Sequence, residues 1–582
     1  MATLFDSASL VMIPSGVKES KLYSVKPSNG DGDFTFSRGT DTATRVNASG
    51  LIEKERANLL LQSNTFDTTW TLSNASVTGG HSGYDGSNDA WELTSTSTSS
   101  ARIQQFESNT GVQSLSIYAK AGTANFIIAE KAGTNGFYAW FDLSNGTIGN
   151  TSGDIDTTIE DVGGGWYRCS ISGNPSTSTK CQFYIVDANG STAVTNGATI
   201  YIQDAQLEQG LVATDYIETT TAAVYEGITD NLPRLDYSGG ASCPSLLLEP
   251  SRTNGLPQSE YFNAWTALND VAITANSITS PEGLLNGSLM AASGVGATAR
   301  NVRQGSQSTS TDVKTLSVYA KANASNYIQL FHSGDAQGYV NFDLANGEVG
   351  TSGTNATADI EPMGNDWYRC IATFDSGANF GSSVYIGFAT SASASYGGGS
   401  VSDTSSVYIF GAQYETGSYP TSYIPTYGTS ASRAADFASS PTNALGGVSE
   451  GTFFIEMTRD GIDTAITGSG ISLRDNSGVE EIRLHFDAPA SQVRWRDGNN
   501  SFAQIGGVLS ITAGTTFKIL VKTDGTTAKA FGNGAQLGSD YSVVSAFDFQ
   551  RIYNNGLGHQ IKQQLFFPTA LTDAECIALT TL

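Results

Sequence analysis

The chain has 582 residues, with 55 acidic against 30 basic side chains and a net charge of −25. This length exceeds what one hydrophobic core supports, so we expect several domains of roughly 100–200 residues each. The negative charge repels phosphate backbones and anionic lipid, which argues against nucleic acid as a partner. The sequence contains no apolar run of about 20 residues and opens without a basic, then apolar, signal segment, so we expect neither membrane insertion nor secretion.

Short runs of β-branched and aromatic residues, separated by Gly, Asn, Asp and Ser, recur along the whole chain. This pattern predicts an all-β fold made of tandem antiparallel β-sandwich modules of jelly-roll type. Residues 1–57 contain hairpin-like pieces such as KLYSVKP and DFTFSR. We expect them to form a separate N-terminal segment that packs on the first module or attaches the protein elsewhere.

A long internal repeat follows this segment. SLSIYAKAGTANFIIAEKAG returns later in the chain as TLSVYAKANASNYIQLFHSG. Three pairs of residues stand 201 positions apart: Tyr118 and Tyr319, Asp142 and Asp343, and Trp166 and Trp367. The matching ends of the repeat place module 1 at 58–219 and module 2 at 254–426, with a structured connector at 220–253 that contains two Pro turns.

Each module has strand periodicity. In residues 115–119 apolar side chains alternate with Ser and Tyr, as in a strand with one buried face. We expect about eight to ten such strands per module. The pairs Asn145-Gly146 and Asn346-Gly347 stand between strand-like runs and predict type I′ hairpin turns.

The last part of the chain, residues 440–582, has a different pattern of alternating strands joined by Gly- and Asp-rich turns. It predicts a second kind of β-sandwich that ends in one short helix. Thr572 and Glu575 stand three residues apart before that helix, as the two members of a capping box do.

Several runs resemble those of a known group of proteins. GDFTFSRGTDTATRVNASGLIE, PRLDYSGGASCPSLLLEPSRTN, LSVYAKA, NDWYRC and GAQYETGSYPTSYIPT closely resemble bacteriophage structural proteins of head-fibre and tail-fibre type, whose modules are similar to carbohydrate-binding sandwiches. FKILVKTDGTTAKAFGNG and LTDAECIALT resemble laminin-G/concanavalin-like jelly rolls. The resemblance covers almost the whole chain and implies a homo-oligomeric fibre or capsid-decoration protein, made in the host cytoplasm and located on the virion. Its implied partners are other virion proteins of the capsid or tail and a host-surface glycan.

The sequence offers little for catalysis. The GxSxG match at 447–451 precedes a strand, whereas a nucleophile elbow follows a strand and precedes a helix. The four histidines are far apart, without metal-ligand or triad spacing. The acidic residues common to both repeats suit structural hydrogen bonds better than glycosidase chemistry, and they are Asp142 and Asp343, Glu160 and Glu361, and Glu208 and Glu415. We therefore expect no enzyme, with a capsular polysaccharide depolymerase as the least favoured alternative.

Outward aromatic residues that the two copies do not share are candidates for carbohydrate binding. Trp140 becomes Asn341 in the second copy, so the fold itself does not require this indole. An aromatic ring can stack on the C–H face of a sugar. The candidates are Phe126, Tyr138 and Trp140 in module 1, Tyr327, Phe331 and Tyr339 in module 2, and Trp495 in the last domain. The alternatives are burial between modules or subunits for the first six and a core position for Trp495.

Metals and cofactors are not required by the sequence. Calcium is possible in the acidic loops 85–89 and 475–477, which lack the ligand spacing of an EF-hand and are otherwise plain turns. The five cysteines are odd in number and have no CxxC spacing, and we expect Cys169 and Cys370 to be small buried hydrophobic residues. A purely architectural role that braces a head or tail without binding glycan is the main alternative to host adhesion.

Overall fold

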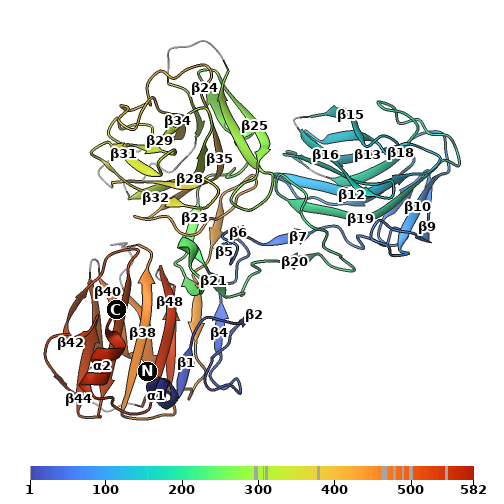
Figure 1. The fold of residues 1–582 in the computed structure, drawn as a ribbon. Coiled ribbons are helices and arrows are strands. Elements are labelled where there is room, and N and C mark those ends of the chain that lie inside the picture. Colours follow the sequence, from blue (N-terminus) through green and yellow to red (C-terminus); the bar gives the residue numbers. More distant parts are fainter. Residues whose placement is uncertain are drawn as a thin grey trace.

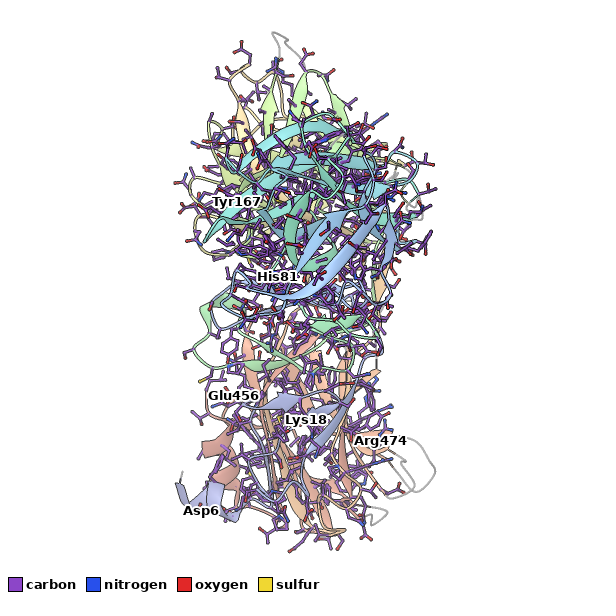
Figure 2. All side chains as sticks on the ribbon, turned by 90° about the vertical axis from the view of Figure 1, so that its right-hand side faces the viewer. Asp6, Lys18, His81, Tyr167, Glu456 and Arg474 are labelled. Carbon is purple, nitrogen blue, oxygen red and sulfur yellow. The ribbon has the colours of Figure 1, made fainter. Side chains whose placement is uncertain are left out.

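The computed structural model describes every residue except 1, 154, 178, 294–298, 306, 308–311, 376–380, 462–467, 476–479, 488–489, 497–501, 544–547 and 557. The chain forms three β-sandwich lobes, which Figure 1 shows with modules 1 and 2 side by side above the lobe that contains both ends of the chain. In Figure 2, His81 and Tyr167 mark module 1, while Lys18, Glu456 and Arg474 mark the lower lobe. The predicted all-β class of antiparallel sandwiches is confirmed.

Module 1 consists of two six-stranded antiparallel sheets around one core. The first sheet has the order β16 (Ile155–Gly163), β17 (Trp166–Gly173), β12 (Gln113–Ala121), β19 (Thr199–Gln209), β10 (Ala90–Ser95), β9 (Ala75–His81). The second has the order β15 (Thr147–Ser152), β14 (Phe137–Asp142), β13 (Phe126–Ala132), β18 (Lys180–Val186), β11 (Arg102–Phe106), β8 (Thr71–Ser73).

Module 2 repeats this topology strand for strand. Its first sheet has the order β32 (Ala356–Pro362), β33 (Tyr368–Phe374), β28 (Lys314–Ala322), β35 (Ser406–Thr416), β26 (Gly287–Ala292), β25 (Val271–Ile278). Its second has the order β31 (Glu348–Ser352), β30 (Tyr339–Asp343), β29 (Tyr327–His332), β34 (Val384–Phe388), β27 (Asn301–Gln304), β24 (Thr266–Leu268). Each module thus has more strands than the eight to ten expected, because short edge strands such as β8 and β24 carry little periodicity.

The lower lobe is assembled from three distant parts of the chain. One nine-stranded sheet contains β21 (Arg234–Asp236), β22 (Ser245–Leu248), β48 (His559–Phe567), β38 (Gly451–Arg459), β43 (Thr516–Thr523), β44 (Thr527–Gly532) and β45 (Ala535–Gln536), with β1 (Leu10–Met12) paired to β48 and β46 (Tyr541–Ser542) to β44. The other contains β2 (Val17–Lys18), β3 (Lys21–Leu22), β4 (Phe34–Ser37), β37 (Phe437–Ser439), β47 (Arg551–Asn555), β39 (Gly468–Arg474), β40 (Glu480–Asp487), β41 (Ala490–Arg496) and β42 (Phe502–Ser510).

The expectation that residues 1–57 form a separate segment packed on module 1 is therefore wrong. Leu10 pairs with Phe566 and Phe36 with Ala438 across two sheets of the lower lobe. Leu10, Phe34 and Phe36 are buried in its core together with Leu246 from the connector. These apolar side chains gain more from completing that core than from forming a free segment.

Shorter elements link the lobes. The two-stranded pairs are β5 (Arg45–Val46) with β6 (Ile52–Glu53), β7 (Arg56–Asn58) with β20 (Val224–Glu226), and β23 (Arg252–Asn254) with β36 (Ala431–Arg433). The helical elements are α1 (Ala2–Ser7), α2 (Asp573–Thr580) and the 3₁₀ turns η1 (Ser238–Gly240) and η2 (Phe262–Ala264). The predicted capping box at Thr572 and Glu575 is confirmed at the start of α2. Within the described residues, no helix has the length and apolarity needed to cross a bilayer.

The hairpin turns differ from the predicted type I′. Four residues connect β14 to β15, and only Gly146, with a φ of 64°, has a left-handed backbone. The Asp142 carboxylate accepts hydrogen bonds from the backbone N–H of Ser144 (2.9 Å) and from Nδ2 of Asn145 (2.8 Å). The Asn thus stabilises the turn through its side chain rather than by adopting a positive φ.

Both modules fasten their first residues to their last strand through the same buried asparagine. In module 2, Nδ2 of Asn254 donates to the carbonyls of Ala412 (3.2 Å) and Ile424 (2.9 Å). Oδ1 of Asn254 accepts from the N–H groups of Leu256 and Tyr414, both at 3.1 Å. Asn58 makes the four equivalent bonds in module 1. The duplication therefore repeats these four hydrogen bonds as well as the hydrophobic core.

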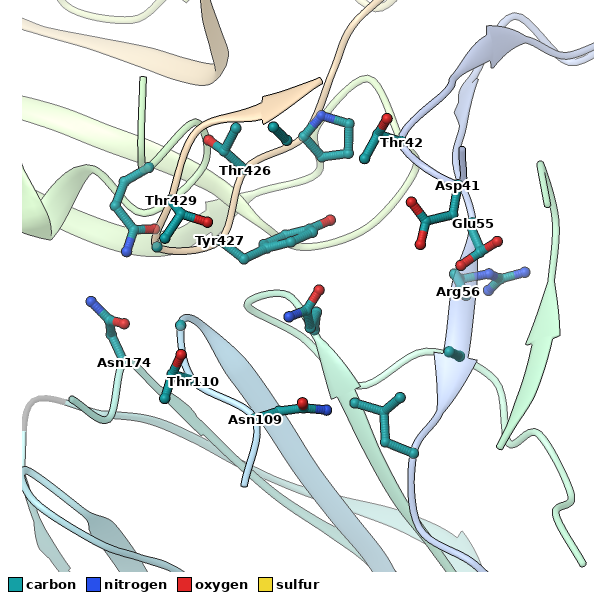
Figure 3. A pocket seen from close by; sticks show the side chains of 18 of the residues that line it. Asp41, Thr42, Glu55, Arg56, Asn109, Thr110, Asn174, Thr426, Tyr427 and Thr429 are labelled. Atoms are coloured by element: carbon teal, nitrogen blue, oxygen red, sulfur yellow. The ribbon is translucent and has the colours of Figure 1, made fainter. Parts of the chain in front are cut away.

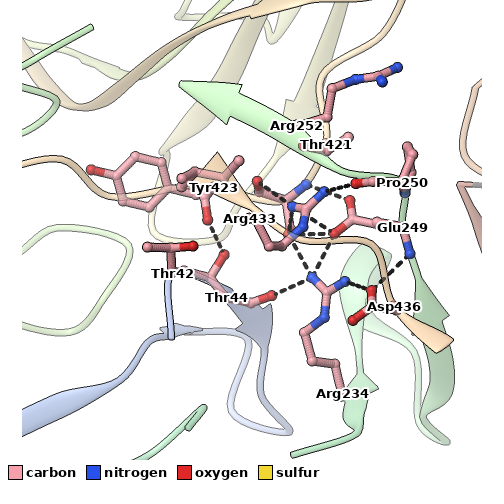
Figure 4. A network of polar contacts seen from close by, with 12 residues as sticks. Thr42, Thr44, Arg234, Glu249, Pro250, Arg252, Thr421, Tyr423, Arg433 and Asp436 are labelled. Atoms are coloured by element: carbon pink, nitrogen blue, oxygen red, sulfur yellow. Dashed lines mark hydrogen bonds and ion pairs between the residues drawn. The ribbon is translucent and has the colours of Figure 1, made fainter. Parts of the chain in front are cut away.

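A buried ion network, in which the Glu249 carboxylate also accepts from the N–H of Ser422 at 2.6 Å, joins the lower lobe to module 2 (Figure 4). Nη1 of Arg234 lies 2.6 Å from the Glu249 carboxylate and Nη2 contacts Asp436. Arg433 reaches the same Glu249 carboxylate at 3.0 Å, and Arg38 reaches Asp436 at 3.4 Å. These charged groups come from the N-terminal segment, the connector and the chain after module 2, so the network fixes the junction of the lobes.

A second buried cluster joins the N-terminal segment to module 2. Nζ of Lys54 lies 2.8 Å from carboxylate oxygens of both Glu260 and Glu282. One ammonium cannot fully neutralise two buried carboxylates, and burial raises the pKa of Glu282 to about 7. Burial likewise raises the pKa of Asp204 in module 1 to about 7, although the Tyr84 hydroxyl donates to it at 2.9 Å.

These two carboxyl groups predict that the protein becomes less stable as pH rises from 5 to 8. A pKa above its unfolded value means that the folded state binds the extra proton, so this stabilisation is complete below about pH 4 and is lost as pH rises through 7. One pKa unit corresponds to about 1.4 kcal/mol, so we expect a loss of more than 1 kcal/mol, measured by denaturant unfolding at each pH. Glu282→Gln should flatten the curve, and stability that rises toward pH 8 would contradict the assignment.

Candidate functional site

The outer face of the β14-β13-β18-β11 sheet contains the module 1 residues that the sequence proposed for sugar binding. Inward Ala139 and Phe141 are fully buried in the core, and Tyr138 and Trp140 lie on the opposite face. The predicted alternation of this strand is thus confirmed. Phe126 and Tyr138 are half-buried, but Trp140 is only 9% exposed.

Trp140 has a structural contact instead of an open ring. Its Nε1 donates to the carbonyl of Ser191 at 2.9 Å, and its ring packs in a cluster with Ile128 and Val186. The segment after β18 therefore lies over the indole. The expectation that Trp140 is an exposed sugar platform is wrong, because the loop uses it as an anchor.

Module 2 anchors its corresponding loop with amides. Asn341, which replaces Trp140, donates through Nδ2 to the carbonyl of Ala394 at 2.7 Å. Gln329 donates to Asn341 at 2.8 Å and accepts from the N–H of Gly397 at 2.7 Å. Both amide side chains are fully buried. The two copies thus perform the same task with different chemistry, which explains why this outward position is not shared.

The next row of side chains on this face also differs between the copies. In antiparallel pairing, residues directly opposite each other lie on the same face. The row in module 1 is Tyr138, Glu130, Gln182 and Gln104. The register places Tyr339, Phe331, Tyr385 and Arg303 at the same points of module 2. The first row is rich in hydrogen-bonding groups and the second in aromatic rings.

The aromatic row of module 2 is packed against itself. Phe331 and Tyr385 stack with centroids 4.6 Å apart, and Tyr396 contacts the edge of Phe331 at 5.1 Å. Phe331 is therefore only 4% exposed, contrary to its expected role as an open sugar contact, while Tyr327 and Tyr339 are half-buried. The ring of Phe331 serves mainly to hold its neighbours.

The polar row of module 1 forms a hydrogen-bonded strip flanked by aromatic rings. In the amide orientation that satisfies both ends, Gln182 donates to the Glu130 carboxylate at 2.8 Å and to the Tyr184 hydroxyl at 3.0 Å. The Arg102 guanidinium lies over the Tyr184 ring, 5.2 Å from its centroid. Burial and the neighbouring Glu130 raise the pKa of Tyr184, so this hydroxyl keeps its proton. Tyr138 stands at the end of the strip, with its ring 5.2 Å from that of Trp140.

We call this set the module 1 strip: Arg102, Gln104, Glu130, Tyr138, Gln182 and Tyr184. Its guanidinium, carboxylate, amides and phenols offer both donors and acceptors, and all belong to rigid strands. Arg102, Glu130, Tyr138 and Tyr184 are partly exposed, whereas Gln104 and Gln182 are only 6% and 5% exposed. The sequence did not single out the polar members, because in sequence they are ordinary outward residues and only the pairing of β11, β13 and β18 brings them together.

Trp495 is not a surface residue. It is 1% exposed and packs in the core of the lower lobe with Val493 and Ile482, so its proposed sugar contact is wrong. Alternation along β41 already places Val493 and Trp495 on one face. The core position that the sequence left as an alternative is the one that the structure shows.

The acidic loop 85–89 has the contacts of a hydrogen-bonded turn. Nε2 of Gln203 donates to Asp89 at 2.8 Å and to Asp85 at 3.3 Å, and the N–H of Ser87 donates to Asp85 at 3.0 Å. In the described residues, no three His, Cys, Asp or Glu side chains gather as a metal site would require. The other proposed calcium loop, 475–477, lies outside the described residues from 476 onward.

Two pairs of repeat-shared acids hydrogen-bond within the fold. Glu415 accepts from the N–H of Thr421 at 2.9 Å and from Gln413 at 2.6 Å, and Glu208 makes the matching bonds in module 1. Asp142 and Asp343 accept bonds from their hairpin turns. Cys169 and Cys370 are fully buried in the two cores, as expected.

Comparisons with known proteins give only partial structural matches. No family model matches the chain, and no curated protein matches it. A solved structure described as Ruminococcus gnavus IT-sialidase CBM40 bound to α2,3-sialyllactose is 14% identical and covers 23% of this chain and 84% of its own, with a TM-score of 0.20. The binding domain of Paraclostridial Mosquitocidal Protein 1 is 13% identical over 25% of this chain, with a TM-score of 0.21. The binding domain of botulinum neurotoxin DC in complex with rat synaptotagmin II is 13% identical over 25% of this chain, with a TM-score of 0.22, and this chain spans 40% of either binding domain.

Proposed function

We propose that this protein is a non-catalytic, homo-oligomeric virion surface protein, a fibre or decoration protein, that contacts host glycan through the module 1 strip. The observation that carries the glycan part is the row of partly exposed side chains on four neighbouring strands, Tyr138, Glu130, Tyr184 and Arg102, which the buried Gln182 and Gln104 hold in place. Three strand spacings of about 4.8 Å give this row a length of roughly 14 Å. That length suits an extended, shallow ligand better than a compact one.

The chemistry of the strip suits a sugar chain. Hydroxyl groups both donate and accept, so they match a mixture of carboxylate, phenol and guanidinium side chains. A half-exposed phenol such as Tyr138 provides a face for the C–H side of a sugar ring. Open strips of this kind bind weakly, and a homo-oligomer that displays several of them gains avidity.

A double variant tests the strip. Tyr138→Ala with Glu130→Ala removes the ring and the carboxylate, and we expect at least ~10-fold weaker binding of the full chain to polysaccharide of the host surface. The measurement is surface plasmon resonance on immobilised polysaccharide. The matched control is Tyr339→Ala in module 2, which occupies the same position in the repeat and should leave binding within twofold. Equal binding by the double variant and the unaltered chain would refute the strip.

The virion part rests on the resemblance of the repeat motifs to phage structural proteins. Antibody labelling of intact particles should detect the protein on the outside of a head or tail. If the antibody detects the protein on the particle but the protein binds no polysaccharide, the result favours the architectural alternative. Release of reducing sugar from capsular polysaccharide would contradict the non-catalytic proposal.

A further inference from the structure

The outer face of the first sheet of module 1 bears a row of partly exposed side chains on neighbouring strands. The register sets Glu92 on β10, Tyr201 on β19 and Lys120 on β12 side by side. Ile200, which precedes Tyr201, is buried in the core, so alternation directs this row outward. The ring of His81, at the end of β9, lies 5.2 Å from that of Tyr201 between centroids. All four are partly exposed, and we call them the first-sheet row: His81, Glu92, Lys120 and Tyr201.

Module 2 has apolar side chains at two of these positions. By register, Ile278 stands at the position of His81. Leu289 likewise stands at the position of Glu92. In module 2 this part of the sheet packs against the N-terminal segment, where Ile278 joins a cluster with Ile52. The fold therefore does not require polar groups here, and module 1 has them on its partly exposed face.

Lys120 differs from its counterpart in the contacts of its ammonium group. In module 2, Nζ of Lys321 donates to the carbonyl of Asn365 at 2.6 Å and lies 3.6 Å from the Asp366 carboxylate. Both of these hairpin positions are glycine in module 1, where Gly165 stands next to the Lys120 stem. In the part of the chain that the structure describes, Lys120 has no hydrogen bond and no ion pair. The module 1 lysine thus presents an unpaired charge to solvent.

The acidic groups nearest to Lys120 have other contacts or stand apart from it. Asp161 accepts from a backbone N–H of its own hairpin at 2.8 Å, and Glu160 stands opposite Arg168 in the register. Glu92 is two strand spacings of about 4.8 Å away. The chain carries a net charge of −25, but at physiological salt charges beyond about 8 Å are largely screened. An anionic group can therefore approach this lysine.

The chemistry of the first-sheet row matches a sugar that carries a carboxylate. The Lys120 ammonium can pair with that carboxylate. The rings of Tyr201 and His81 offer faces for the C–H side of a sugar ring. Burial and the neighbouring Glu92 raise the pKa of Tyr201, so its hydroxyl remains a donor, while the Glu92 carboxylate accepts from sugar hydroxyls.

We propose that the first-sheet row binds a hexuronic acid unit of an acidic polysaccharide, with Lys120 on its carboxylate and Tyr201 against its ring. The row lies on the sheet opposite the module 1 strip and does not depend on it. The equivalent place in module 2 is not such a site, because Asp366 and Asn365 hold its lysine.

The test uses the full chain with glucuronic and galacturonic acid, each beside glucose or galactose, which have a hydroxymethyl group in place of the carboxylate. Saturation-transfer NMR titrations measure the affinities. We expect at least one uronic acid to bind at least ~5-fold more tightly than its neutral counterpart, with a smaller preference at high salt. Lys120→Met keeps the apolar stem and should abolish this preference. Tyr201→Ala should weaken the binding of acid and neutral sugar alike.

A second variant removes the preference without deleting the lysine. Gly165→Asp supplies module 1 with the acid that module 2 has at this position. Gly165 has a φ of 79° and Asp366 a φ of 60°, so the hairpin accommodates aspartate in this conformation. We expect Gly165→Asp to reduce the uronic acid preference to less than twofold, because the new carboxylate competes for the Lys120 ammonium. Unchanged melting temperatures show that both variants fold.

The matched control is Lys321→Met in module 2, which should leave the preference unchanged, as should the strip variant Tyr138→Ala with Glu130→Ala. The proposal is overturned if neither uronic acid binds more tightly than its neutral counterpart. It is also overturned if Lys120→Met keeps the preference, or if the strip variant loses it. A strip variant that loses polysaccharide binding but keeps the uronic acid preference supports a separate site on the first sheet.

Discussion

Replacing Arg234 with methionine is expected to lower the free energy of unfolding by about 3–5 kcal/mol. The guanidinium of Arg234 is fully buried and contacts the carboxylates of both Glu249 and Asp436. Its Nη1 also donates to the carbonyl of Thr44 at 3.0 Å. Methionine fills much of the same volume but leaves these acceptors buried with one positive partner fewer. Breaking a buried ion network from one side costs more than the network contributes as a whole.

The measurement is denaturant unfolding followed by calorimetry, because the lobes need not unfold together. Arg45→Met is the matched control, since Arg45 pairs with Glu53 at 2.8 Å near the surface and such exposed pairs contribute at most about 1 kcal/mol. A loss below 1 kcal/mol for Arg234→Met would mean that the neighbouring Arg433 and Arg38 neutralise the acids unaided.

The repeat made most of the fold predictable from the sequence. Recurrence at a constant spacing defined two modules, and period-two alternation identified the inward face of strands such as 137–142, which the core packing confirms. The lower lobe was harder to predict. Its strand Leu10–Met12 pairs with residues near 565, and nothing local in the sequence marks a partner so far along the chain. Non-local pairing is decided by which core a strand completes, and this information lies in the assembled structure.

The candidate site was predicted only in part. Alternation correctly placed Tyr138 and Trp140 outward, but the coverage of Trp140 depends on the path of the loop that carries Ser191. The polar members of the strip carry no signal of their own, because Gln104 and Gln182 become neighbours only through strand register. The cavity that Glu55, Asn109 and Tyr427 line (Figure 3) was invisible in the sequence for the same reason. Gln258 and Thr426 come from opposite ends of module 2 and meet the loops of module 1 only after folding.

The repeat also shows which positions were free to change. The row under the loop is Trp140 and Ile128 in one copy and Asn341 and Gln329 in the other, yet both sets hold a loop. By contrast, Asn58 and Asn254 are identical in residue and in bonds. Apolar packing and amide bonding can both anchor a loop, whereas satisfying two carbonyls and two N–H groups at once requires an amide of this size. The shared asparagine is therefore the more demanding position.

Replacing Asn254 with alanine is consequently expected to destabilise module 2 by about 3–4 kcal/mol. The substitution leaves two buried carbonyls and two buried N–H groups without their partner, and an unsatisfied buried group costs about 1–3 kcal/mol before water compensates. Asn58→Ala should have an effect of the same size that is confined to module 1. Hydrogen exchange measures each separately, through the amides of β35 and β19.

The control is Asn145→Ala, which removes a single 2.8 Å bond in an exposed turn and should cost about 1 kcal/mol or less. Equal small losses of stability for all three variants would show that water replaces the amide. The hydrogen bonds of the asparagine would then be a consequence of the fold rather than a cause of its stability. A large loss of stability for the Asn254 and Asn58 variants alone would mean that each module depends on one polar side chain to hold its first residues against its last strand. Selection would then preserve the asparagine in both copies. This agrees with the identity of Asn58 and Asn254, in contrast to Trp140 and Asn341, which differ between the copies.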